Sequence, residues 1–275
     1  MTSGVDGFSD GISEGSFDAR FPLECRTTED IQQDVMCRRN LISEHDRRYY
    51  AQYSLPALRR SGGLHTNGDW SIYLKSLEYI PENDRCKYTQ HSLPALIATG
   101  ILKNSLDWES YFRVLELIPK YERNNYTHQA LPELASVCRR MAAETWRLYR
   151  ASLELIAPSD RATYTRFILP ALVRTNSLKT PEDWAAAARG YNTAVKLVSP
   201  VESANYKHNS LPSLILAGGL KNARDWENYL KTLERVQEYQ RSIYTRYFLP
   251  ALSRSGALKT ADDWQKNASN YIAAR

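Results

Sequence analysis

The chain has 275 residues, of which 43% are hydrophobic and 24% are charged, and its formal net charge at pH 7 is +5. These proportions are typical of a soluble globular protein. No uninterrupted apolar stretch approaches the ~20 residues that a membrane helix requires, so we expect a soluble chain with no membrane partner.

The first 25 residues differ in composition from the rest of the chain. They are rich in Gly, Ser and Asp, and they lack the basic start and apolar block of a secretory signal. We predict that residues 1–25 are a disordered acidic tail and that 26–275 form one repeat domain. The tail carries a charge of −4, so the remainder carries about +9, which favours acidic partners of some kind.

The four cysteines give no sign of a disulfide framework or a zinc site. Their spacing is unpaired, and they share no repeat position, so we expect reduced intracellular thiols. They are Cys25, Cys37, Cys86 and Cys138.

A Leu-Pro pair recurs through the chain at steps of 38, 38, 38, 42 and 38 residues. A fixed period in this range indicates a repeat architecture. The leucines of the pairs are Leu55, Leu93, Leu131, Leu169, Leu211 and Leu249. Fifteen residues after each leucine stands a tryptophan, at Trp70, Trp108, Trp146, Trp184, Trp226 and Trp264.

The residues between each leucine and its tryptophan predict a helix end followed by a helix start. A glycine beyond the Leu-Pro helix can adopt the left-handed conformation that ends a helix. A Thr or Asn three residues before an Asp is typical of an N-terminal cap. The glycines are Gly62, Gly100, Gly218 and Gly256, and the cap residues are Thr66, Asn104, Thr180, Asn222 and Thr260.

Each tryptophan opens an amphipathic helix, and each proline lies inside a second helix. Trp108, Tyr111, Phe112, Leu115 and Ile118 occupy one helical face, which we expect to be core. A tyrosine stands five residues before every Leu-Pro leucine. The proline removes one helical hydrogen bond, so the second helix must bend or divide there, and we favour a bend. Repeat four has four extra residues after Trp184, which predicts one more helical turn.

The helix pairs at a 38-residue period resemble α-solenoids of the HEAT/TPR type, and no specific family is identified. The resemblance implies an all-α, right-handed solenoid of about six helical hairpins, with one period of 42 residues, plus a terminal helix. The segment 27–35 has cap chemistry but no tryptophan, so we expect a degenerate first helix there.

Glutamate and arginine recur together near the end of the tryptophan helix. Glu78, Glu116, Glu154 and Glu234 are each followed by an arginine seven residues later. Where the glutamate is replaced by Lys196, the arginine is replaced by Ser203. We therefore predict an ion pair that fastens the turn between the two helices.

Function is expected where the repeats differ, because shared packing explains the recurrent residues. The residues three before each Leu-Pro pair are Gln52, Gln90, His128, Arg166, His208 and Arg246. The residues two before it are Tyr53, His91, Gln129, Phe167, Asn209 and Tyr247. Adjacent helices would align them into two columns along one surface. Another column at the turns comprises His65, Lys103, Lys179, Lys221 and Lys259.

Two binding functions fit this pattern. The first is a protein–protein interaction scaffold that takes a peptide or helix of a partner along the polar-aromatic columns. The second is a helical-repeat reader of RNA or DNA that holds phosphates with cations and stacks bases on Tyr and Phe. The positive charge is spread along the array among acidic residues, which favours the protein partner.

An enzyme is a third class, and the sequence gives it little support. HExxH, GxSxG, GxxxxGK[ST] and GxGxxG motifs are absent, and the five histidines are spread over several repeat positions instead of converging with Cys or Asp at ligand spacing. We expect no catalytic residue, cofactor or metal. The expected location is the cytoplasm, or a host cell if the polar tail is a delivery signal, while the oligomeric state is left open.

Overall fold

The structure is a computed structural model that describes residues 41–62, 66–138 and 141–274. Within these ranges the regular structure is entirely helical. The predicted tail 1–25 and the predicted first helix at 27–35 lie outside the described residues.

Each repeat contributes one helix that begins just before its tryptophan, here called the Trp helix. The predicted caps are confirmed: Thr66 Oγ1 and Asn104 Oδ1 accept from the N–H of the Asp three residues on, at 3.2 and 3.0 Å. α10 is an exception, because Ala142 precedes it and offers no capping side chain. The Trp helices are α4 (Asn67–Tyr79), α7 (Ser105–Leu117), α10 (Ala143–Glu154), α13 (Pro181–Leu197), α16 (Ala223–Arg235) and α19 (Ala261–Ala273).

The other helix of each repeat, the Pro helix, carries the Leu-Pro pair and has three consecutive parts. A short α-helical turn leads into a five-residue π-helical segment, and a further α-helix starts at the leucine. The parts are α2 (Arg47–Tyr49), Tyr50–Ser54 and α3 (Leu55–Arg60); α5 (Arg85–Lys87), Tyr88–Ser92 and α6 (Leu93–Thr99); α8 (Arg123–Asn125), Tyr126–Ala130 and α9 (Leu131–Val137); α11 (Arg161–Thr163), Tyr164–Ile168 and α12 (Leu169–Arg174); α14 (Ser203–Asn205), Tyr206–Ser210 and α15 (Leu211–Leu216); α17 (Arg241–Ile243), Tyr244–Phe248 and α18 (Leu249–Arg254).

The π-helical segment is how the chain accommodates the proline. In the first Pro helix the Leu55 N–H donates to the carbonyl of Tyr50, five residues back, and Pro56 follows at once. An α-helix would place the proline ring against the carbonyl four residues earlier and leave that carbonyl without its donor. The wider turn gives the ring room. The Pro helices therefore do not divide at the proline, because helical dihedral angles continue through the junction.

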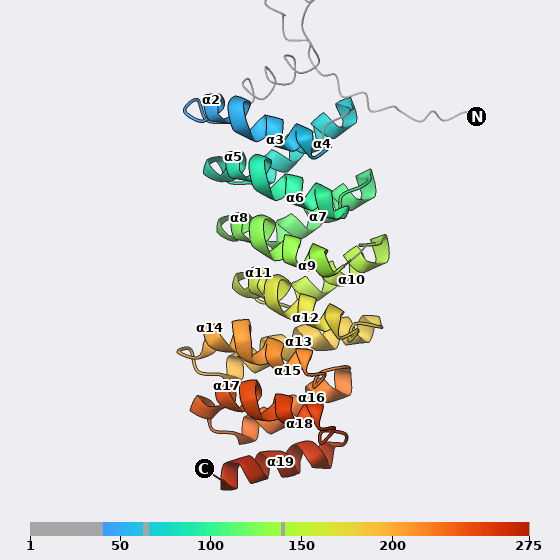
Figure 1. The fold of residues 1–275 in the computed structure, drawn as a ribbon, viewed down its shortest axis with the longest axis vertical. Coiled ribbons are helices and arrows are strands. Elements are labelled where there is room, and N and C mark those ends of the chain that lie inside the picture. The colour runs from blue at the N-terminus through green and yellow to red at the C-terminus, as the bar shows by residue number, and fades with distance from the viewer. Residues whose placement is uncertain (1–40, 63–65, 139–140, 275) are drawn as a thin grey trace, which may run out of the picture. The chain divides into compact units, whose positions relative to one another are not determined.

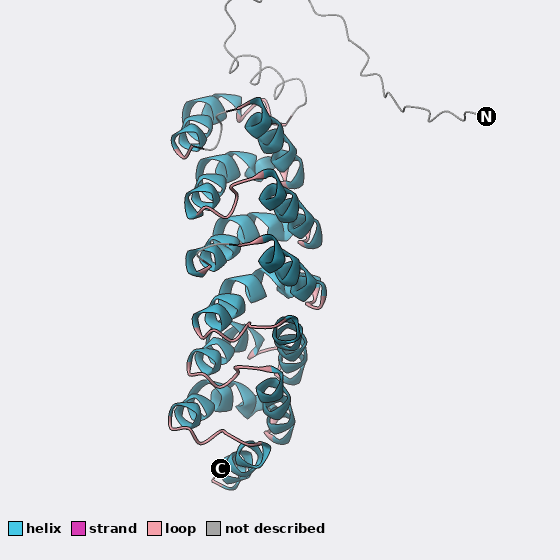
Figure 2. Ribbon diagram, turned by 90° about the vertical axis from the view of Figure 1, so that its right-hand side faces the viewer, coloured by secondary structure: helices cyan, strands magenta, loops and turns pink. Residues whose placement is uncertain are grey.

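The helix pairs follow one another in chain order and form an all-α solenoid. In Figure 1 the α-helices after each proline lie one below another in the front layer, with the Trp helices behind them. Figure 2 shows the same arrangement from the side, as two columns of helices joined by short loops. Glycines with positive φ end four Pro helices, as predicted, at Gly62, Gly100, Gly218 and Gly256.

The largest fully buried side chains between the layers are the recurrent aromatic residues. Five of the six tryptophans are buried, whereas Trp108 is half-buried and departs from the core role predicted for every indole. The tyrosine that begins each π-helical segment is buried throughout, with at most 3% of its surface exposed. These are Tyr50, Tyr88, Tyr126, Tyr164, Tyr206 and Tyr244.

Buried tyrosine hydroxyls connect four of the Pro helices to the Trp helix that follows, through the pairs Tyr50–Tyr73, Tyr88–Tyr111, Tyr126–Tyr149 and Tyr206–Tyr229. The hydroxyls of Tyr164, Tyr191 and Tyr244 have no hydrogen-bond partner within the described residues. Tyr126 and Tyr149 share a hydrogen bond of 2.8 Å, and Tyr149 reaches Thr165 of the next Pro helix at 2.9 Å. Burial raises the pKa of Tyr88 to about 12, so such hydroxyls stay protonated and can donate at neutral pH. Satisfied polar groups in a dry core fix the register of neighbouring helices, since a slip would leave them unpaired.

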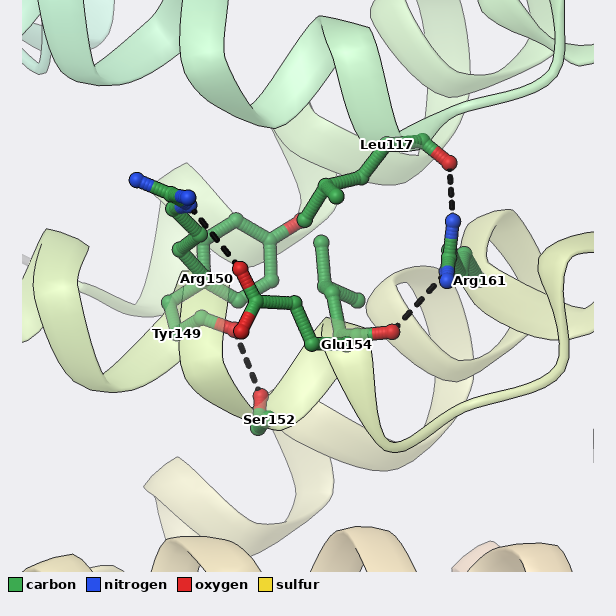
Figure 3. Close-up of polar contacts among 7 residues, drawn as sticks. Leu117, Tyr149, Arg150, Ser152, Glu154 and Arg161 are labelled. Carbon is green, nitrogen blue, oxygen red and sulfur yellow. Dashed lines mark hydrogen bonds and ion pairs between the residues drawn. The ribbon is translucent and has the colours of Figure 1, made fainter.

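The recurrent arginine donates to backbone carbonyl groups, so the prediction that it pairs with the recurrent glutamate was wrong. Arg161 Nε donates to the carbonyls of Leu153 and Ile156 at 2.8 and 3.1 Å, and its NH1 donates to the carbonyl of Leu117 in the preceding repeat. Glu154 pairs with Arg150 at 3.1 Å (Figure 3). Arg85, Arg123 and Arg241 make the corresponding contacts. Arg123, Arg161 and Arg241 thus join the carbonyl ends of two successive Trp helices, which leave carbonyls without helical donors.

We predict that Arg161→Met lowers the free energy of unfolding by about 1.5–3 kcal/mol, because the carbonyls it joins lose charged donors. Glu154→Gln is the matched control and should change stability by less than about 0.5 kcal/mol, since its ion pair is exposed. Urea unfolding measures both. Equal losses in the two variants would show that the glutamate, and not the carbonyl groups, is the important partner.

The extra residues of repeat four form one more helical turn, as predicted. α13 has 17 residues where α16 has 13. The added turn brings Gly190 against the ring of Trp226, and a Cβ at Gly190 would lie 2.2 Å from Trp226 Cε3. A glycine inside a helix normally weakens it. Here it permits the close approach of α13 and α16.

We predict that Gly190→Ala lowers stability by about 1–3 kcal/mol despite the better helix propensity of alanine, because the methyl group overlaps the Trp226 ring. The control is Gly68→Ala in α4, where the nearest atom to a new Cβ is Thr66 Oγ1 at 3.5 Å. That variant should melt at or slightly above the parent temperature. A Gly190→Ala protein that melts with the parent in a calorimetric scan would refute the tight contact.

Candidate functional site

All twelve predicted partner-binding residues lie in the π-helical segments of the Pro helices. They occupy the third and fourth of the five positions, between a buried first tyrosine and the Leu-Pro pair. We call this set the polar-aromatic surface: Gln52, Tyr53, Gln90, His91, His128, Gln129, Arg166, Phe167, His208, Asn209, Arg246 and Tyr247.

The side chains of this surface are exposed or half-buried in every repeat. Tyr53 and Tyr247 keep 48% and 61% of their surface exposed, which is unusual for large aromatic residues. Gln90, Arg166, Phe167 and Arg246 are half-buried, and the others are exposed. The expectation that these positions face outward is therefore met.

Contacts between repeats join the two columns into a single surface. The fourth π-helical residue of one repeat meets the third of the next: the rings of His91 and His128 lie 6.3 Å apart, and those of Phe167 and His208 lie 4.5 Å apart. Arg166 donates to the side-chain carbonyl of Gln129 in the same way. Since each contact bridges adjacent Pro helices, a ligand placed here touches consecutive repeats.

Two arginines on this surface stack on the aromatic residue that follows them. The guanidinium carbon of Arg166 lies 4.9 Å from the centre of the Phe167 ring, and that of Arg246 lies 5.1 Å from the Tyr247 ring. Burial, followed by the neighbouring Arg166 and Lys207, lowers the pKa of His208. His208 is therefore mostly neutral at pH 7, whereas Arg166 and Arg246 are charged and Lys207, beside His208, is paired with Asp160 at 2.7 Å.

Sequence reasoning missed the residues one helical turn upstream that complete the surface. Tyr49 packs its ring 5.0 Å from that of Tyr53, and its hydroxyl donates to Gln90 at 2.7 Å. Asn205 Oδ1 accepts from Arg246 at 3.2 Å and from Asn209 at 3.0 Å. Helical spacing could have revealed these residues in the sequence, because residues three or four apart share a helical face.

The predicted lysine column lies in the turns at the other end of the Pro helices, where its backbone groups take part in capping the Trp helices. The backbone N–H groups of Lys103, Lys179, Lys221 and Lys259 donate to the aspartate four residues on, at 3.0, 3.3, 2.9 and 3.2 Å. Their side chains are exposed. His65 lies outside the described residues. This column is therefore separate from the polar-aromatic surface.

The thiols that can be assessed are poor nucleophiles. Cys86 and Cys138 are free and buried, and burial raises the pKa of each to about 11. Both are therefore protonated at neutral pH. Cys25 and Cys37 lie outside the described residues.

Metal binding and membrane crossing find no supporting feature in the described part of the chain. Its His, Cys, Asp and Glu side chains nowhere gather in threes that could hold a metal ion. Among its helices, none has the length and apolar character needed to cross a membrane.

Comparison of the chain with protein-family models, with curated proteins and with solved structures gives no match.

Proposed function

We propose that this chain is a non-catalytic scaffold that binds a protein partner along the polar-aromatic surface. The observation that carries the proposal is the contrast within each π-helical segment. The first tyrosine recurs and is buried, whereas the third and fourth residues vary from repeat to repeat and reach solvent. Packing explains the recurrent position. The variable positions lie outside the core and contact one another at the surface. Tyr, His, Arg and Asn are ordinary contact residues of protein interfaces.

The contacts that the surface arginines make within the chain support a binding partner that carries carboxylates. Arg166 contacts the neutral Gln129 and its own aromatic neighbour, and Arg246 contacts Asn205 and Tyr247. A guanidinium group has five N–H donors and binds carboxylates in a bidentate geometry. Both groups therefore retain donors for an acidic side chain. The proposed location is the cytoplasm, or a host cell if residues 1–25 act as a delivery signal.

We predict that replacing Arg166, Phe167, Arg246 and Tyr247 together by alanine abolishes capture of the partner while the melting temperature changes little, because these side chains are exposed or half-buried. The matched control replaces Arg113, Arg147 and Lys231, exposed cations of the Trp helices, and should capture normally. Quantitative affinity purification from cell lysate compares the three proteins. Unchanged capture by the fourfold variant would place the binding face elsewhere.

Nucleic-acid binding is the second candidate, because arginine-aromatic pairs also suit phosphates and bases. We expect no measurable affinity for random-sequence single-stranded RNA at ~150 mM salt, since acidic residues such as Glu133 and Asp160 lie among the cations. A fluorescence-anisotropy titration at several salt concentrations tests this. Tight binding that weakens steeply with salt, and disappears in the fourfold variant, would favour the nucleic-acid function.

A further inference from the structure

We infer that a hollow between α12 and α15 receives one large apolar side chain of an extended partner segment, next to a carboxylate of that segment. This inference rests on the proposed function and names the chemistry of the partner. The hollow has a volume of about 320 Å³ and adjoins the polar-aromatic surface through Arg166 and Phe167. This volume is at the lower end of the range for ligand sites, which suits a single side chain.

The apolar part of the hollow comes from two successive Pro helices, while Glu133, Arg166 and Arg174 supply charged groups around it. Ala171 and Pro212 are buried at its base, and Phe167 and Leu216 border it. Leu216 keeps 51% of its surface exposed, although a leucine gains about 1.5–3 kcal/mol from full burial. An apolar group inserted beside Leu216 and Phe167 would remove both from water.

The short side chain of Ala171 leaves room for the hollow between longer neighbours. Ala171 has no side chain beyond Cβ, and it lies on one helical face between Phe167, four residues before it, and Arg174, three residues after it. Long side chains thus stand on both sides of a short one. In α9 the same position is Glu133, whose side chain reaches across to Arg174 and closes the hollow on that side.

The rim of the hollow carries more positive than negative charge. Arg174 and Glu133 form an ion pair of 2.9 Å that leaves 48% and 44% of the two side chains exposed, so the pair is weak and can exchange partners. Arg166 also lines the hollow, and its contacts there are with the neutral side chain of Gln129 and the ring of Phe167. A partner carboxylate beside the inserted side chain would supply the missing anion.

The distance to the second arginine-aromatic pair sets the length of the segment. Arg246 and Tyr247 lie two Pro helices beyond Arg166 and Phe167. Packed helices are about 8–10 Å apart, so two steps cover about 16–20 Å. An extended peptide advances about 3.3 Å per residue. A second carboxylate about five or six residues from the first would therefore reach Arg246.

The test selects a displayed library of random twelve-residue peptides on the full chain and measures the affinity of enriched peptides by fluorescence anisotropy. We expect enriched sequences with Leu, Phe or Trp next to Asp or Glu and a second acid about five or six residues away. Leu216→Asn and Arg166→Gln should each weaken binding at least about tenfold. The controls Ala98→Asn, at the matching position of α6, and Arg113→Gln, on a Trp helix, should change it less than about twofold.

The outcomes separate this inference from the proposed function. If Arg246→Ala with Tyr247→Ala abolishes peptide binding while Leu216→Asn and Arg166→Gln do not weaken it, the chain binds peptides but the hollow is not the site. Selection of basic peptides would also overturn the inference. If no peptide is enriched, or if no substitution on the polar-aromatic surface matters, both proposals are wrong. Leu216 is half exposed, so its variant should fold, which a melting curve verifies.

Discussion

The missing N–H group of a proline inside a helix governs both the packing and the candidate binding surface. Each Pro helix accommodates the proline by forming a π-helical segment, in which a leucine N–H donates to a tyrosine carbonyl five residues back. One wide turn then places the tyrosine in the core and the third and fourth residues toward solvent. π-Helical turns are often found at functional sites. Here the same local constraint fixes the repeat and presents its variable side chains.

Polar contacts at fixed positions carry this geometry from one repeat to the next. In four repeats a pair of tyrosine hydroxyls connects the Pro and Trp helices within the core. Arginines such as Arg123 donate to carbonyls at the ends of two Trp helices, here those of Tyr79 and Ile118. Apolar contacts alone allow sliding, because they have little directionality. Hydrogen bonds to backbone carbonyls are directional and hold neighbouring helices at one relative position. Repeat five has Ser203 in place of the arginine, and α13, with its added turn, instead packs closely on α16 through Gly190.

The sequence predicted what depends on local chemistry and periodicity. Caps such as Thr180, the left-handed glycines, the added turn of α13 and the helix pairs are all confirmed, because each follows from residues near one another in the chain. It did not predict interactions with the backbone of another repeat. The positions of Glu154 and Arg161 change together from repeat to repeat, which suggested an ion pair. The actual partners of the arginine are backbone carbonyls, which every residue has and which therefore give no signal in the sequence. The partial exposure of Trp108 likewise carried no signal.

The candidate surface was predictable as a set of positions but not as a shape. Aligning the repeats was enough to find Arg166 and Phe167, since both stand at outward-facing positions where the residue type varies among the repeats. The hollow beside them depends on a third residue, Ala171, and on Leu216 of the next repeat. Whether a short side chain among long ones forms a hollow can be recognised only when the relative placement of the neighbouring helices is known. Specificity in such an array therefore arises from combinations across repeats, so that changing one residue alters the site without altering the fold.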